Sequence, residues 1–256
     1  MIGLGLGLTS MRGRRRVLAF DPASLFVSGE QGAWYDPSDL STMFTDTAGT
    51  TPAAVGDPVG RINDKSGNDN HATQETAAAR PILRQTVGGL YYLEFDGVDD
   101  ELVGPDLNPF RNTEAELSAF CGYRHLSAQT GYLFATNTSS SLTGHSSSYL
   151  LRASEPPDWV LGGILNPLGI NQNTSDQITF VSMERNGLTE GEYGWGSSTE
   201  NASIGSARSS NVMIGGRGGA FAHMRLYQFL LIDRRVTEQE RVTTRDFVAS
   251  NSGVTL

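Results

Sequence analysis

Gln177-Ile178-Thr179-Phe180-Val181-Ser182-Met183-Glu184 is the stretch that most directly indicates the fold. In an extended strand, Ile178 and Phe180 fall on one side, and Thr179 and Val181 fall on the other. Both sides are partly apolar, whereas a sheet with one face in water would show a polar side. The stretch therefore predicts a strand that is covered on both faces, as in a double-layered β-sandwich.

Similar short runs follow one another from residue 90 onward. β-branched, aromatic and aliphatic residues recur roughly every 10–20 residues, with Gly, Asn, Ser and Pro between them. No segment with a helical period separates the runs, so a parallel design of alternating strands and helices is not expected. The runs cover residues 91–95, 117–124, 131–136, 148–152, 159–163, 177–184, 211–215 and 222–233.

The C-terminal part carries the signals of one helix. Thr237-Glu238-Gln239-Glu240 is a capping box, in which the threonine hydroxyl accepts an amide hydrogen and the last glutamate reaches back. An apolar stripe follows at Val242, Phe247 and Val248, and Gly253 suits the end of a helix. The sequence therefore predicts a short C-terminal helix.

The N-terminal part has a different composition. Residues 1–30 begin with alternating Gly and Leu, which cannot form a stable helix alone, so we expect an extended arm. The arm carries a basic cluster that is either a solvated tail or a segment that orders against an acidic neighbouring protein: Arg12, Arg14, Arg15 and Arg16. Residues 31–256 are expected to form one sandwich domain, with a loop-rich leading segment (31–89) and the main strands (90–256).

Charge and composition exclude several classes of function. The formal net charge of −9 argues against nucleic acid as the partner, because phosphate binding needs clustered Lys and Arg. Cys121 is the single cysteine, so we expect no internal disulfide and a small buried side chain. No apolar run approaches the ~20 residues of a membrane span. We therefore expect a soluble protein made in the cytosol, without membrane insertion.

Two segments near the ends of the strand-rich region carry a family resemblance. Leu93-Glu94-Phe95-Asp96-Gly97-Val98-Asp99-Asp100 matches the Phe-Asp-Gly-x-Asp-Asp strand and turn of laminin-G-like domains, which have the concanavalin A-like fold. Residues 227–241 are similar to their closing strand and helix start, with Val236 where Leu is usual. The resemblance spans roughly residues 60–253. It implies an all-β, concanavalin A-like jelly-roll β-sandwich with an N-terminal extended arm and a short C-terminal helix.

Three segments farther upstream carry a second resemblance. Residues 32–44, 64–74 and 79–81 resemble segments of structural proteins of tailed bacteriophages. It implies a virion protein, either tail-associated (a tail fibre or tail-tip protein) or a capsid decoration or cement protein. The arm would then attach the chain to other virion proteins. Because homo-oligomers are closed and symmetric and fibre-like proteins are commonly trimers, we expect a homotrimer.

The acidic residues near the first strand allow three interpretations. Glu94, Asp96 and Asp99 match the Glu-x-Asp-x-x-Glu motif of laminarinase-type glucanases except at the last position. In this interpretation the protein is a glycoside hydrolase, and Glu94 and Asp96 are its catalytic carboxylates. Asp96-Gly97 is a turn signal, so Asp99 is expected beyond a bend. Asp96, Asp99 and Asp100 could instead supply oxygen ligands to calcium. The interpretation that we favour is that Asp96 accepts backbone amides in a tight turn, while Asp99 and Asp100 are solvated.

Three aromatic residues are candidates for sugar binding. Trp159 follows two prolines, and Tyr193 and Trp195 lie among glycines, so we expect all three on loops. Their rings could stack on sugars, or they could be core residues next to turns. We predict a non-enzymatic virion protein whose sandwich binds a host-surface glycan or a neighbouring subunit. A polysaccharide depolymerase on the same fold and a purely structural cement protein are the alternatives.

Overall fold

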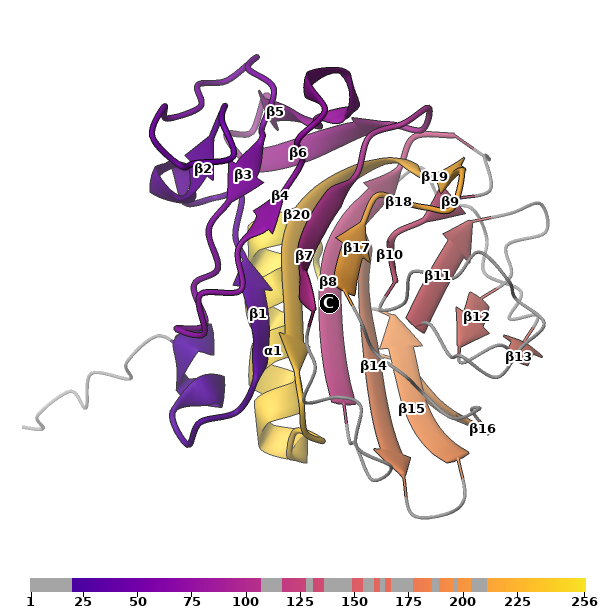
Figure 1. Ribbon diagram of the computed structural model, residues 1–256. Helices are drawn as coiled ribbons and strands as arrows, with labels where there is room; N and C mark the ends of the chain where they lie inside the picture. The colour runs from indigo at the N-terminus through magenta and orange to yellow at the C-terminus, as the bar shows by residue number, and fades with distance from the viewer. Residues whose placement is uncertain are drawn as a thin grey trace, which may run out of the picture.

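The computed structural model describes residues 20–106, 117–127, 131–135, 149–153, 159–161, 164–166, 177–185, 189–195, 198–203 and 211–256. In the strands between residues 149 and 203 it describes the backbone alone, Ile178 excepted. The described chain is mostly β-sheet and carries an α-helix at its C-terminal end (Figure 1). The predicted all-β class and C-terminal helix are confirmed. Within this described part, no helix has the length and apolar character needed to cross a membrane.

An eight-stranded antiparallel sheet, here called the central sheet, organises the molecule (Figure 1). Its strands are β1 (Gly32–Tyr35), β5 (Ile82–Gln85), β6 (Tyr91–Asp96), β8 (Leu117–His125), β14 (Gln177–Arg185), β15 (Thr189–Trp195), β16 (Ser198–Ser203) and β20 (His223–Ile232). The strand order is β16-β15-β14-β8-β20-β6-β5, and β1 also pairs with β20.

Two further sheets complete the β-structure. The second sheet has the order β10-β17-β7-β4-β3-β2 and consists of β2 (Met43–Phe44), β3 (Arg61–Ile62), β4 (Ala72–Thr73), β7 (Leu102–Asp106), β10 (Phe134–Ala135) and β17 (Asn211–Ile214). The third has the order β13-β12-β11-β9-β19-β18 and consists of β9 (Gly131–Tyr132), β11 (Tyr149–Ala153), β12 (Trp159–Leu161), β13 (Ile164–Asn166), β18 (Gly216–Arg217) and β19 (Ala220–Phe221). Short 3-10 helices are η1 (Pro22–Phe26), η2 (Leu40–Thr42) and η3 (Ala77–Ala79).

Alternation along the central strands separates two apolar cores. In β20, Phe229 and Leu231 belong to the core between the central and second sheets, whereas Leu230 and Ile232 belong to the core beneath α1 (Glu238–Ser252). Successive side chains of a strand point to opposite faces, so the run is apolar throughout because both faces are buried. We call the face toward the second sheet the inner face and the face that carries α1 the outer face.

The helix α1 begins and ends as its sequence predicts. Thr237 Oγ1 accepts the amide of Glu240 (3.3 Å), and Glu240 Oε2 accepts the amide of Thr237 (2.7 Å). Gly253, in the left-handed region with φ 71°, ends the helix. Ser252 lies over β8, where a Cβ added to Gly122 would come within 2.0 Å of the serine Oγ. The helix therefore covers the outer face as far as Gly122.

The arm prediction is wrong for residues 20–30. Leu25 and Phe26 in η1 are buried in the core beneath α1. The ring of Phe20 meets Phe247 of the helix edge-on, with 6.1 Å between ring centroids. Apolar side chains in residues 20–30 therefore pack against the domain. The Gly-Leu repeat that precedes them gives no sign of this packing. Residues 1–19, including Arg12, Arg14, Arg15 and Arg16, lie outside the described residues.

Residues 31–89 form part of the sandwich. Tyr35, Met43 and Ile62 are fully buried in the core between the sheets. The segments that resemble phage proteins, 32–44 and 64–74, lie against each other. The carboxylate of Asp64 accepts the amide of Trp34 (2.7 Å), and the Tyr35 hydroxyl donates to the Asn70 carbonyl (2.6 Å). These residues thus hold β1 at its place beside β20.

A buried polar network strengthens the same junction. Asp36 is 4% exposed and accepts hydrogen bonds from Gln228 Nε2 and from Lys65 Nζ (2.7 Å). The Lys65 ammonium also lies 4.4 Å from the centre of the Trp34 ring, and Trp34 Nε1 donates to Gln228 Oε1 (3.1 Å). Because buried polar groups are stable only when they are paired, this network specifies how the leading segment docks on β20.

Candidate functional site

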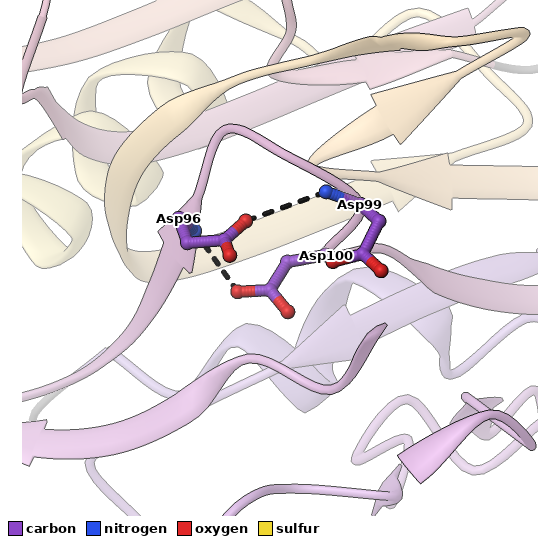
Figure 2. A group of neighbouring side chains, drawn as sticks. All are labelled: Asp96, Asp99 and Asp100. Carbon is purple, nitrogen blue, oxygen red and sulfur yellow. Dashed lines mark hydrogen bonds between the residues drawn. The ribbon is translucent and has the colours of Figure 1, made fainter. Parts of the chain in front are cut away.

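The turn between β6 and β7 brings three carboxylates together (Figure 2). Gly97, with φ 77°, allows the chain to bend sharply after β6. One oxygen from each of Asp96, Asp99 and Asp100 lies within 4.8 Å of the others. The cluster forms because the turn reverses the chain, so that Asp99 and Asp100 lie close to Asp96 at the end of β6.

Hydrogen bonds within the turn use two of these carboxylates. Asp96 Oδ1 accepts the amides of Val98 (2.7 Å) and Asp99 (3.4 Å). Asp100 Oδ2 accepts the amide of Asp96 (2.9 Å), and Figure 2 shows how this bond joins the two ends of the turn. The predicted turn-capping role of Asp96 is confirmed, and Asp99 lies beyond the bend as expected. The expectation that Asp100 is solvated is wrong, because its carboxylate is buried against the Asp96 amide.

Burial and neighbouring charges set the ionisation of Asp100. Only 4% of the residue is exposed, and this burial raises the pKa of Asp100 to about 6. The negative charges of Asp96, Asp99 and Glu94 also raise the pKa, while the bond from the Asp96 amide lowers it. A cation would relieve this repulsion. Calcium takes six to eight oxygens, however, so the three carboxylates supply only part of a coordination shell.

Glu94 and Asp96 lie on the outer face of β6. Phe95 between them is buried in the inner core, and their partners on β20 run in continuous register: Arg225 opposite Glu94 and His223 opposite Asp96. Glu94 Oε1 lies 3.3 Å from Arg84 Nε. The two carboxylates therefore share a face, as a glycosidase would need, but one is ion-paired and the other is part of a turn.

The aromatic candidates lie in strands and not in the predicted loops. Trp159 begins β12 in the third sheet, while Tyr193 and Trp195 belong to β15 of the central sheet. The surrounding glycines indicated loops. However, β15 pairs with both β14 and β16, and these pairings supply hydrogen bonds to its backbone. The side chains of these three residues are outside what the structure describes.

The register of β15 gives these positions a face. Tyr193 pairs with Val181 and Trp195 with Thr179, and these two residues pair in turn with Ala119 and Cys121 of β8. Ala119 and Cys121 belong to the inner core. Since directly opposite residues share a face, Tyr193 and Trp195 occupy neighbouring positions on the inner face of the central sheet. Trp159 lies in a different sheet and is not paired with them.

A basic group near Glu94 has no signal in the local sequence. Arg84, Arg124 and Arg225 come from three central strands that the chain reaches at widely separated points. The alternation of His223, Met224, Arg225 and Leu226 does place Arg225 outside the inner core. Its position opposite Arg124 depends on cross-strand register, which no local pattern contains.

Comparisons with known proteins show a shared fold. No protein-family model and no curated protein sequence matches this chain. An arabinofuranosidase complexed with arabinofuranosyl-α-1,2-xylobiose is similar with a TM-score of 0.63 and 13% identity, over 91% of this chain and 65% of that one. Trypanosoma rangeli sialidase in complex with sialic acid is similar with a TM-score of 0.55 and 16% identity, over 90% of this chain and 34% of that one. This chain thus spans only part of the length of either enzyme.

Proposed function

We propose that this chain is a non-enzymatic, lectin-like β-sandwich of the concanavalin A-like jelly-roll type that binds a host-surface glycan. The observation that carries the proposal is the register of β15, which aligns Tyr193 and Trp195 on one face. Residues two apart in a strand are separated by ~6.6–6.8 Å. Two aromatic rings at this spacing can contact successive sugar rings through their apolar faces.

The solved structures with a similar fold support a carbohydrate ligand. The two described above are named for enzymes that act on glycosides, and their bound molecules are sugars. The jelly-roll assignment has a separate basis, because antiparallel sheets that pack across a common core are its basic architecture.

The surroundings of Glu94 and Asp96 favour binding over catalysis. A retaining glycosidase needs one carboxylate to attack and the other to donate a proton. Glu94 is held by Arg84, and Asp96 Oδ1 accepts two backbone amides of its own turn. The alternative function is a polysaccharide depolymerase that uses this pair. The observation in its favour is that both carboxylates lie on one face with no register shift between them.

We further propose that the protein is a component of a phage virion. Residues 1–19 would attach it, through Arg12, Arg14, Arg15 and Arg16, to an acidic surface of another virion protein. A closed homotrimer would present three sandwiches outward. A capsid cement protein without glycan binding is the remaining alternative. Deletion of residues 1–19 tests the attachment, because the truncated protein should fold but no longer enter particles; normal incorporation would contradict it.

Binding of the labelled, purified chain to host cells tests the glycan function. We expect saturable binding that free surface polysaccharide competes away, and a severalfold loss in Tyr193→Ala and Trp195→Ala. Tyr91→Ala, which removes a half-buried ring from β6, is the matched control and should bind normally. Absence of wild-type binding would overturn the proposal and favour a cement role. Release of reducing sugar that disappears in Glu94→Gln would instead establish the depolymerase.

A further inference from the structure

A basic strip crosses the outer face of the central sheet. Arg225 on β20 lies opposite Arg124 on β8 and, on its other side, opposite Glu94 on β6. Leu226 beside it belongs to the inner core, so Arg225 and its paired residues lie on the outer face. Arg84 on β5 completes the strip through its contact with Glu94 (3.3 Å). One arginine thus contacts Glu94, and the other two occupy the next two positions across the sheet.

This gathering of three arginines on one face contrasts with the composition of the whole chain. The whole chain has a formal net charge of −9. Like charges directly opposite each other on neighbouring strands are destabilising, yet Arg124 and Arg225 occupy such a pair of positions. Arginine side chains in this arrangement are suited to a carboxylate, which they can bind through two parallel hydrogen bonds.

Aromatic packing orients the central arginine. The Arg225 guanidinium carbon lies 4.7 Å from the centre of the Tyr92 ring. The Tyr92 ring in turn packs against fully buried Tyr227, with 5.5 Å between centroids. Stacking holds a guanidinium through its flat face and sets the direction of its N–H groups. A group oriented in this way loses less freedom when a ligand binds.

The helix α1 ends immediately before the strip. Its last residue, Ser252, lies over Gly122 on β8. Arg124 is the next outer-face position along the same strand. Along β8, the part of the outer face that α1 covers therefore ends at Gly122, and the basic strip begins two residues later at Arg124.

The border of the strip on β6 is acidic. Asp96 is exposed on the same face, two residues beyond Glu94, and Asp99 is its neighbour in the turn. A carboxylate placed against Asp96 would be repelled, so a ligand is oriented with its carboxylate toward the arginines. A sugar acid carries one carboxylate and several hydroxyl groups, and those hydroxyls can donate to Asp96 or Asp99.

We propose that the basic strip binds the carboxylate of an acidic sugar, with Arg124 and Arg225 as its ligands. Arg84 neutralises Glu94 beside the site, and the sugar hydroxyls lie toward Asp96. The inference rests on the proposed glycan binding and names the ligand class. It also assigns a site on the opposite face of the sheet from Tyr193 and Trp195.

Polygalacturonate and its fully methyl-esterified form test this site, since esterification removes the negative charge and adds only a methyl group to each carboxyl. The full chain should bind the acid form at least tenfold more tightly than the ester, and less so at high salt. Arg124→Gln should remove this preference. Arg245→Gln, at a half-buried position of α1 that is ion-paired with Asp246, is the matched control and should keep it. Arg225→Lys retains the charge but loses the two-point geometry, so it should weaken binding while circular dichroism stays unchanged.

The contrary outcomes distinguish failure of the acidic-sugar site from failure of the proposed glycan-binding function. Equal binding of both polymers, or an unchanged preference in a folded Arg124→Gln, would overturn the acidic-sugar site. If Trp195→Ala still weakened binding to host polysaccharide severalfold, the proposed function would survive that result. If Arg124→Gln failed to fold, Arg225→Lys would decide. Failure of the wild-type chain to bind polygalacturonate at all would likewise overturn the site, whereas failure to bind host cells would overturn the proposed function.

Discussion

The two halves of β20 meet different surroundings on the outer face. Residues 229–232 are buried on both sides, and Leu230 and Ile232 lie beneath α1. In residues 223–226, Met224 and Leu226 are buried in the inner core, whereas the alternate residues are only half-buried. The sequence changes accordingly, from strict alternation to an unbroken apolar run.

This difference shows where the strand has a face available for ligands. Alternation indicates burial on one side, and a continuous apolar run indicates burial on both. The pairing of β20 with β8 shifts register between Leu226 and Gln228, at the junction of the two halves. An extra residue at such a bulge redirects the side chains that follow it. The same strand can therefore serve as core at one end and as a binding surface at the other.

The largest effect is expected from truncating the covered half. Leu230→Ala removes a fully buried side chain beneath α1 and should lower the free energy of unfolding by about 2–5 kcal/mol. His223→Ala changes the other half of the same strand and should shift it by less than ~0.5 kcal/mol. Urea unfolding of both variants measures the contrast. Similar losses in the two would mean that both halves are packed alike.

An intermediate effect is expected from the acidic turn that borders the uncovered half. The pKa of Asp100 is about 6 when folded, above its ordinary value of 3.8, so the folded state holds more protons between these pH values. Stability contributed by the protonated form is therefore lost as the pH rises through this window. Asp100→Asn keeps an oxygen for the Asp96 amide and removes the charge. It should raise the free energy of unfolding at pH 7 by on the order of 1–3 kcal/mol.

Thermal unfolding between pH 3.5 and 7.5 checks the Asp100 prediction. The wild-type chain should lose stability across pH 4–6 relative to the variant, and parallel curves would contradict the assigned pKa.

The same measurement with added calcium tests the carboxylate cluster as a metal site. Calcium should raise the melting temperature of the wild type and not that of Asp100→Asn if the three carboxylates bind it.

The smallest effect is expected beneath the helix. Thr244 Oγ1 is buried and has no hydrogen-bond partner among the described residues. Thr244→Val replaces the hydroxyl with a methyl of similar size and should stabilise the protein by up to ~1 kcal/mol. Thr243→Val is the control, because Thr243 Oγ1 donates to the Gln239 carbonyl (2.9 Å) and its loss should not stabilise. Calorimetry resolves the difference, and a destabilised Thr244→Val would indicate a bound water.

Local patterns predicted some parts of the fold and of the site. The capping box and Gly253 define α1 because their hydrogen bonds join residues within one turn. The turn at Gly97, with Asp96 accepting its amides, followed from neighbouring residues in the same way. The docking of residues 20–30 did not, because Phe20 and Leu25 gain their apolar partners only from α1 and β20.

The sequence by itself determined that this protein is built of strands, where the final helix begins and where the acidic turn bends. These features depend on side chains two to four residues apart, whose geometry the backbone sets. The tertiary structure alone placed Tyr193 and Trp195 in a paired strand and aligned Arg124 with Arg225. Such placements depend on register between strands that are far apart in the chain. A shift of one residue would exchange the faces, and the packing of the whole core selects between the two.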